Sequence, residues 1–302
     1  MRMGRAIVAA VMLGGATTLP RERVVRIDTT SPMTVDGMAG RLRIDPGAPG
    51  RPVLAPDYAG RVGLKGGGML AFGVTYHVGR ERVQGKTQVA AVSIDGGRRH
   101  KRRVLWAPRA FAAGVEAVTG PGGVDEPVVR FVLRPPVAGE RTVAMPVAPS
   151  GGLFGDWSAM AGLVEVGGQP LRIRIAPYLA RSVATAAAAA QLAEGLGGRL
   201  DDRTDMAEIA FGLRRPVRGM VLARPLAIGP LSLDTVAVRT ADGGSVAALP
   251  TMTAVEADPD EIVVVAKGRR APGSMTLGAD ELRRCSSIVF DKPARVIRLT
   301  CA

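Results

Sequence analysis

Short runs of alternating apolar and polar residues recur along the chain and predict strands. They include residues 21–27 (RERVVRI), 126–135 (EPVVRFVLRP) and 224–238 (RPLAIGPLSLDTVAV), and Gly- and Pro-containing turns separate them. A different pattern occupies Val183–Leu196, which is rich in alanine and ends at Gly197-Gly198, as a short helix with a glycine cap does. The pattern predicts a mainly β protein with few helices.

One layout occurs twice in the chain. RLRIDPGAPGRPVLAPDYAGRVGLKGG (41–67) and RIRIAPYLARSVATAAAAAQLAEGLGG (172–198) each contain a basic/apolar strand, an Asp-Pro or Ala-Pro turn, an Ala-containing stretch and a Gly-Gly stop. A repeat of this kind predicts two related lobes. We place the lobes at 21–136 and 163–302, with 137–162 as a linker without strand periodicity. Asp45 stands in the first copy and Ala176 in the second.

Composition and charge limit the classes of binding partner that the protein can have. The 302 residues hold 39 Gly and 22 Pro but only 4% aromatic residues, and the formal net charge is +13. The positive charge is mostly arginine spread along the chain, without the aromatic residues that stack on single-stranded bases, which argues against nucleic acid. The densest basic run, RRHKRR at 98–103, is expected to be a solvated hairpin tip. An anionic envelope surface stays open as a partner.

The N-terminus and the cysteines indicate export. Residues 1–16 combine two arginines, a short apolar stretch and small residues, as a signal peptide does, and the apolar stretch is too short to span a bilayer. The two cysteines, Cys285 and Cys301, flank a β-rich segment with a turn at 291–294, and a hairpin would allow a disulfide between them. A periplasmic or secreted protein is expected; two free thiols in a cytosolic protein are the alternative.

Several segments together resemble the pepsin/retropepsin family of aspartic proteases. RLRIDPGAP resembles the Asp-bearing loop, 67–79 the approach to the flap, AVTG (117–120) the apolar-apolar-Gly turn, and 275–299 the closing segment of retropepsin-like domains. The resemblance covers most of the chain after about residue 34 and implies two β-barrel lobes with one short helix each. It assigns Asp45 to the catalytic position, Gly47 to the turn beside it and Tyr76 to the flap, while a core or rim role for Tyr76 is the alternative.

The same resemblance shows what is missing. Aspartic proteases use two carboxylates that share a proton, one activating water and the other protonating the carbonyl. The position matching Asp45 in the second copy is Ala176, and Pro46 and Pro177 replace the usual hydroxyl residue in both loops. The expectation is therefore an exported protein whose cleft binds an extended peptide or unfolded segment around Asp45, Gly47, Tyr76 and Ala176 without catalysis.

Two alternatives stay open: an active endopeptidase that uses Asp45 in a dimer or with an unrecognised second carboxylate, and an envelope structural protein with a basic surface. No cofactor or metal is expected, because the two histidines lack metal-ligand spacing and no phosphate-binding or dinucleotide motif is present. The sequence thus leaves enzyme activity undecided.

Overall fold

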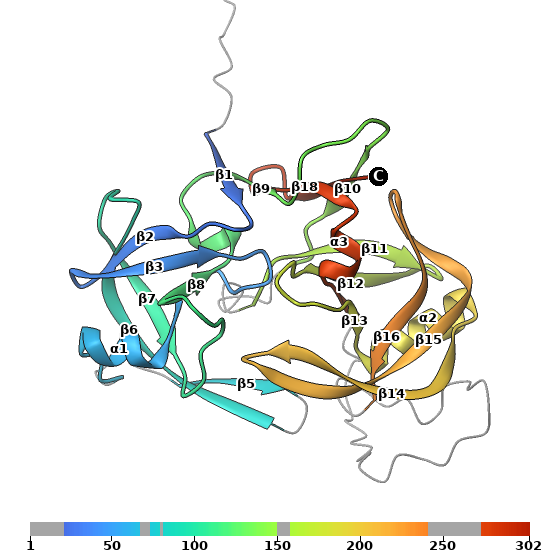
Figure 1. Ribbon diagram of the computed structural model, residues 1–302, viewed down its shortest axis with the longest axis horizontal. Coiled ribbons are helices and arrows are strands. Elements are labelled where there is room, and N and C mark those ends of the chain that lie inside the picture. Colours follow the sequence, from blue (N-terminus) through green and yellow to red (C-terminus); the bar gives the residue numbers. More distant parts are fainter. Residues whose placement is uncertain (1–20, 67–72, 79–80, 150–157, 241–272) are drawn as a thin grey trace, which may run out of the picture.

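The protein is mainly β and is built from three sheets (Figure 1). The computed structural model describes residues 21–66, 73–78, 81–149, 158–240 and 273–302. The expected signal peptide, 1–16, lies outside the described residues.

The N-terminal sheet has the strand order β2-β3-β8-β4-β7-β6-β5. The α-helix that accompanies this sheet is short: Pro56 opens it and Gly63, with φ 79°, ends it. The elements are β2 (Ser31–Val35), β3 (Met38–Ile44), β4 (Val53–Leu54), α1 (Pro56–Val62), β5 (Val74–Val78), β6 (Glu81–Ile94), β7 (His100–Trp106), β8 (Ala117–Thr119) and the 3₁₀ turn η1 (Pro121–Gly123).

The C-terminal sheet repeats this arrangement as β11-β12-β17-β13-β16-β15-β14. In the N-terminal sheet β8 lies between β3 and β4, parallel to the first and antiparallel to the second. In the C-terminal sheet β17 lies between β12 and β13 in the same way. The elements are β11 (Ala161–Val166), β12 (Gln169–Ile175), β13 (Val183–Ala184), α2 (Ala186–Leu196), β14 (Arg199–Ala210), β15 (Leu213–Ile228), β16 (Leu231–Arg239), β17 (Ser274–Leu277) and α3 (Ala279–Leu282). The duplication predicted from the sequence is therefore present in the strand pairing.

The alanine-rich helix is confirmed, starting three residues later than the composition suggests. Val183 and Ala184 pair with β16 and β17 as the short strand β13, and Thr185 then caps α2 by accepting from the backbone N–H of Ala188. Gly197 ends α2 in the left-handed region at φ 71°. Small side chains let α2 lie close against β15 (Figure 1).

A third sheet, the connecting sheet, joins strands from distant parts of the chain in the order β1-β9-β18-β19-β10. Its strands are β1 (Glu22–Arg26), β9 (Val128–Val132), β10 (Arg141–Pro146), β18 (Cys285–Asp291) and β19 (Val296–Cys301). β10 lies within 137–162, where we expected a linker without strands, and β11 also starts there at Ala161. Only Met145 of β10 is buried, so no apolar alternation marks this edge strand in the sequence.

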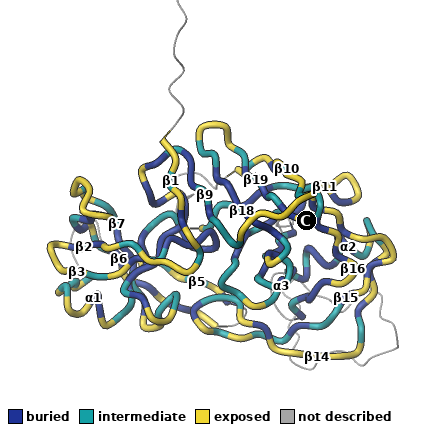
Figure 2. Tube along the Cα trace, turned by 45° about the horizontal axis from the view of Figure 1, so that its top comes forward, coloured by how far each residue is buried: buried dark blue, intermediate teal, exposed yellow. Residues whose placement is uncertain are grey.

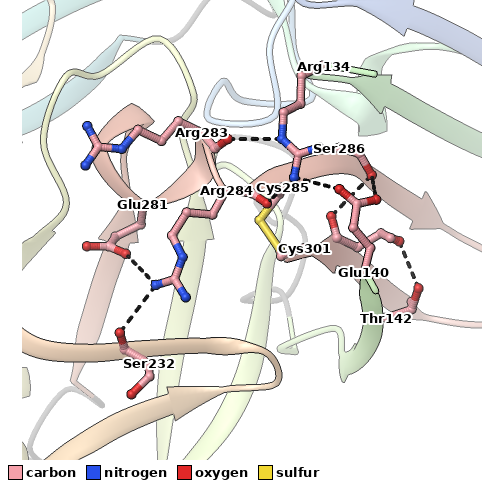
Figure 3. Close-up of a disulfide and its surroundings, with 11 residues drawn as sticks. Arg134, Glu140, Thr142, Ser232, Glu281, Arg283, Arg284, Cys285, Ser286 and Cys301 are labelled. Carbon is pink, nitrogen blue, oxygen red and sulfur yellow. Dashed lines mark hydrogen bonds and ion pairs between the residues drawn. A yellow bond between two sulfur atoms is a disulfide. The ribbon is translucent and has the colours of Figure 1, made fainter. Parts of the chain in front are cut away.

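The expected C-terminal hairpin and its disulfide are confirmed. Cys285 lies opposite Cys301 across β18 and β19, and the two are bonded (Figure 3). Beside them the Ser286 hydroxyl donates to Glu140 over 2.6 Å, and Arg134 forms an ion pair of 2.6 Å with the same carboxylate. These contacts connect the hairpin to the chain before β10.

The largest apolar cluster contains buried residues of all three sheets. Buried residues run through the interior of the molecule, and exposed residues lie around its periphery (Figure 2). Within the connecting sheet the rings of Phe131 and Phe290 pack edge to face at 5.8 Å. Among the described residues, no helix has the length and apolar character needed to cross a membrane.

Candidate functional site

The two copies of the repeated loop have the same backbone hydrogen bonds. Asp45 follows β3 and donates from its backbone N–H to the carbonyl of Thr119 over 2.8 Å; Ala176 follows β12 and donates to Leu277 over 2.9 Å. In the tight turn that follows, the backbone N–H of Ala48 donates to the Asp45 carbonyl, and that of Leu179 donates to the Ala176 carbonyl, each over 3.0 Å. The loop conformation therefore does not depend on the aspartate side chain.

A glycine allows each loop to approach the strand that ends beside it. A Cβ at Gly120 would lie 2.2 Å from the carbonyl oxygen of Ala48, and one at Gly278 would lie 2.5 Å from the carbonyl carbon of Arg181. Neither place can hold a larger residue without moving backbone. Gly120 is the glycine of AVTG, and Gly278 lies in the closing segment 275–299.

The two loops contact each other across the boundary between the sheets. A Cβ at Gly47 would lie 2.9 Å from the Ala176 Cβ, so the Asp45 loop and its counterpart pack directly together. Arg174, two residues before Ala176, donates to the Gly47 carbonyl over 3.3 Å. In the opposite direction, the Arg43 guanidinium lies 4.5 Å from the centre of the Tyr178 ring. The structure thus brings together three of the predicted residues, Asp45, Gly47 and Ala176.

Asp45 is a buried carboxylate without a carboxylate partner among the described residues that influence it. It is 5% exposed, and its Oδ1 accepts from the Gly47 N–H over 2.7 Å. Burial raises the pKa of Asp45 to about 6, and this rise is opposed by the Gly47 hydrogen bond and by the charges of Arg43 and Arg174. The Asp45 carboxyl group can therefore exchange a proton near neutral pH, but no second carboxylate among the described residues shares that proton.

Tyr178 occupies the position in the second loop that matches Gly47. Its hydroxyl donates to the Ile27 carbonyl over 2.7 Å, and burial, followed by the charge of Asp45, raises its pKa to about 12. The hydroxyl therefore stays protonated at neutral pH. It ties the second loop to the chain just after β1.

A cavity of about 860 Å³ lies beside these loops and is lined by residues of both large sheets. Tyr76 of β5 lines it, as does Arg174, whereas Asp45, Gly47 and Ala176 do not. Asp45 is buried and does not line the cavity, and Arg174 is the residue shared by the cavity and the loop contact. Of the predicted site residues, Tyr76 alone faces the open space.

The tip of the β14–β15 hairpin closes one side of the cavity. This hairpin is the counterpart of β5–β6, and its tip points toward β5 (Figure 1). Phe211, at φ 55°, is 2% exposed and packs at 5.1 Å against the rings of both Tyr76 and Phe111. The sequence shows only Phe211-Gly212 between two strand patterns; nothing in it indicates that the tip enters the opposite half.

The cavity is basic. Three arginines of the C-terminal sheet line it, Arg172 and Arg174 from the same face of β12 and Arg239 from the end of β16. No aspartate or glutamate is found among its described lining residues. Sequence reasoning missed these arginines, although the repeated RLR and RIR of the two copies were a signal that could have been compared.

No metal site is indicated: within the described part of the chain, no group of three or more His, Cys, Asp or Glu side chains is placed to hold an ion. No protein-family model matches the chain, and no curated protein matches it in sequence. The fold by itself defines a mainly β protein with a duplicated seven-stranded sheet.

Proposed function

We propose that this is an exported, two-lobed protein of the aspartic-protease type that binds an extended peptide in the cavity between its lobes and does not cleave it. The support for a degenerate site is the contact between the repeated loops. Where a dyad needs a second carboxylate facing Asp45, the chain has the methyl group of Ala176 against Gly47. Alanine has no side-chain proton to give or accept.

The arrangement of charges supports the same proposal. In a dyad, two carboxylates share one proton and titrate as a pair. Asp45 instead has two arginines as its charged neighbours, and their positive charge opposes the rise in pKa that burial causes. A water molecule bound at Asp45 would have one carboxylate to accept its proton and no second carboxylic acid beside it to protonate a substrate carbonyl.

The packing of the loops also argues against a dimer that pairs two copies of Asp45. Ala176 and Arg174 of the same chain already contact Gly47. A second molecule would have to displace them to bring its own carboxylate to Asp45. An active endopeptidase remains the second candidate because burial raises the pKa of Asp45 to about 6, which suits a general base.

The cavity supports peptide binding. It has edge strand β5 on one side and aromatic and aliphatic side chains around it, among them Tyr76 and Phe111. An extended segment can pair with an edge strand and place alternate side chains in such a space. The disulfide is compatible with an oxidising compartment, which supports export.

The test uses fluorescently labelled β-casein, an unfolded substrate, incubated with the protein from pH 3.5 to 7.5. We expect saturable binding by fluorescence anisotropy and no new fragments. Asp45→Asn, which keeps the shape of the side chain, and Asp45→Ala are measured in parallel. Cleavage by the wild type that disappears in both variants would establish the endopeptidase instead, and absence of binding as well as cleavage would overturn the peptide-binding proposal.

A further inference from the structure

The matching arginines of the two seven-stranded sheets have different neighbours. In the N-terminal copy Arg41 and Arg43 occupy β3, and in the C-terminal copy Arg172 and Arg174 occupy the matching places in β12. The registers correspond, since Leu42 lies opposite Ala117 in one and Ile173 opposite Met275 in the other. The neighbours of these pairs can therefore be compared position by position.

Arg41 has a carboxylate partner within its own sheet. The residue just before Ala117 is Glu116, which accepts from the Arg41 Nε over 3.1 Å and from the Arg41 backbone N–H over 2.9 Å. This hydrogen-bonded pair lowers the pKa of Glu116.

The matching residue in the C-terminal copy is Ser274. It lies opposite Arg172 in the β12–β17 register and lines the cavity. The arginine position has thus been kept while the carboxylate position has become a small neutral residue.

Arg172, the counterpart of Arg41, donates to the Pro149 carbonyl instead of to a carboxylate. Arg174 is the counterpart of Arg43 and lies on the same face of β12 as Arg172. The Arg174 Nε is buried and has no hydrogen-bond partner among the described residues, and the hydrogen bond found for Arg174 goes to the Gly47 carbonyl. Burial and the charge of Arg239 both lower the pKa of Arg174, while Asp45 raises it. Two guanidinium groups near each other in a partly closed space are favoured by an anion placed between them.

We propose that Arg172, Arg174 and Arg239 form a subsite for a carboxylate of the bound peptide, in the place that Glu116 fills in the other copy. The inference rests on the proposed peptide-binding function and specifies its ligand as an acidic segment. The surrounding Phe111, Phe211 and Tyr76 favour a peptide, which has apolar side chains on both sides of the acid, over a small inorganic anion.

Three labelled octapeptides test the subsite by fluorescence anisotropy. The first is Ser-Val-Ala-Val-Glu-Ala-Val-Ser with an amidated end, the second has Gln in place of Glu, and the third is the Gln peptide with a free terminal carboxylate. We expect the Glu peptide to bind at least about tenfold more tightly than the amidated Gln peptide, the effect of a charge-assisted hydrogen bond. Tight binding of the third peptide would identify the chain terminus as the carboxylate recognised.

Two variants locate the effect. Arg174→Gln removes the guanidinium, and Ser274→Glu supplies an internal carboxylate like that of Glu116; each should abolish the preference for Glu over Gln. Arg141→Gln, an exposed arginine of β10 outside the cavity lining, should keep it. Circular dichroism checks that each variant is folded, and the two test variants change the site in opposite chemical ways.

The outcomes separate this inference from the proposal on which it rests. Equal binding of the Glu and Gln peptides, or a preference that survives in Ser274→Glu, overturns the carboxylate subsite while peptide binding stands. Failure of all three peptides and of β-casein to bind overturns both.

Discussion

The loop after β3 and the loop after β12 have the same backbone hydrogen bonds but different ionisable side chains. Both close with the same pair of hydrogen bonds, to Thr119 and Asp45 in one copy and to Leu277 and Ala176 in the other. Only the first loop carries an acid, and among the described residues only the first copy has a carboxylate, Glu116, hydrogen-bonded to an arginine of the strand before the loop. The comparison shows that the fold of the loop is set by its strands and glycines, so the ionisable side chains could change independently of it.

The comparison also shows that Asp45 is not held for stability. A buried carboxyl group whose pKa is raised favours folding less when it is ionised than when it is protonated. Ala176 fills the same place at no such cost. Substitutions that change the side chains of one loop toward those of the other should therefore have predictable effects on the free energy of unfolding.

The largest effect is expected from Ala176→Asp. A second buried carboxylate beside Asp45 would be ionised with little solvation, and we expect a loss of about 4 kcal/mol at pH 7.5. The loss should shrink at pH 4.5, where the pair can share a proton. Urea denaturation at both pH values measures it.

Ala180→Asp is the matched control, since Ala180 is exposed in the same loop. It should change stability little at either pH. If Ala176→Asp were equally neutral, the two loops would not enclose a dry contact. If it produced cleavage of β-casein, the first copy would have kept a working half of a dyad.

Asp45→Asn should have the next largest effect. Because the pKa of Asp45 is raised from 3.8 to about 6, the wild type loses stability as the pH rises from about 4 to about 6, by about 3 kcal/mol in total. The Asn variant lacks this titration, so its advantage over the wild type should appear across that range. The measurement is the difference in unfolding free energy between the two proteins at each pH.

Asp57→Asn provides the reference, because Asp57 lies exposed on α1 and pairs with Arg61 at the surface. Its difference from the wild type should be small and should not follow the same curve. A pH-independent difference for Asp45→Asn would mean that Asp45 titrates as it does in water.

The smallest effect concerns Tyr178, the counterpart of Gly47. Tyr178→Phe removes the hydrogen bond to the Ile27 carbonyl and keeps the ring beneath Arg43, so a loss of about 1–2 kcal/mol is expected. Thermal unfolding compared with Tyr178→Leu, which removes the stacking as well, separates the two contributions. An unchanged melting temperature in the Phe variant would show that water replaces the hydroxyl at Ile27.

Local pattern was enough to predict much of the fold. Alternation gave the mainly β class, the composition of 183–196 gave α2, and the turn at 291–294 placed Cys285 opposite Cys301. Each of these depends on residues near one another in sequence. The repeat itself gave the correspondence of Asp45 and Ala176.

Other features could not be read from local pattern. β10 exists because β19 offers it a partner, and Phe211 is buried because the opposite half has an apolar site for it. The basic cavity depends on register, which places Ser274 rather than a carboxylate opposite Arg172. Such contacts join segments whose proximity only the complete fold determines.

The connecting sheet has a consequence for how the chain reaches this structure. All strands of the N-terminal sheet lie within residues 31–119, so that sheet can form early during synthesis. β9, however, pairs with β18, and the nearby Ser286–Glu140 bond joins residues 146 positions apart. Contacts of such high sequence separation form slowly. Until β18 and β19 have been made, β9 has an unpaired edge and Phe131 lacks Phe290, which makes this the stage at which aggregation or chaperone capture is expected.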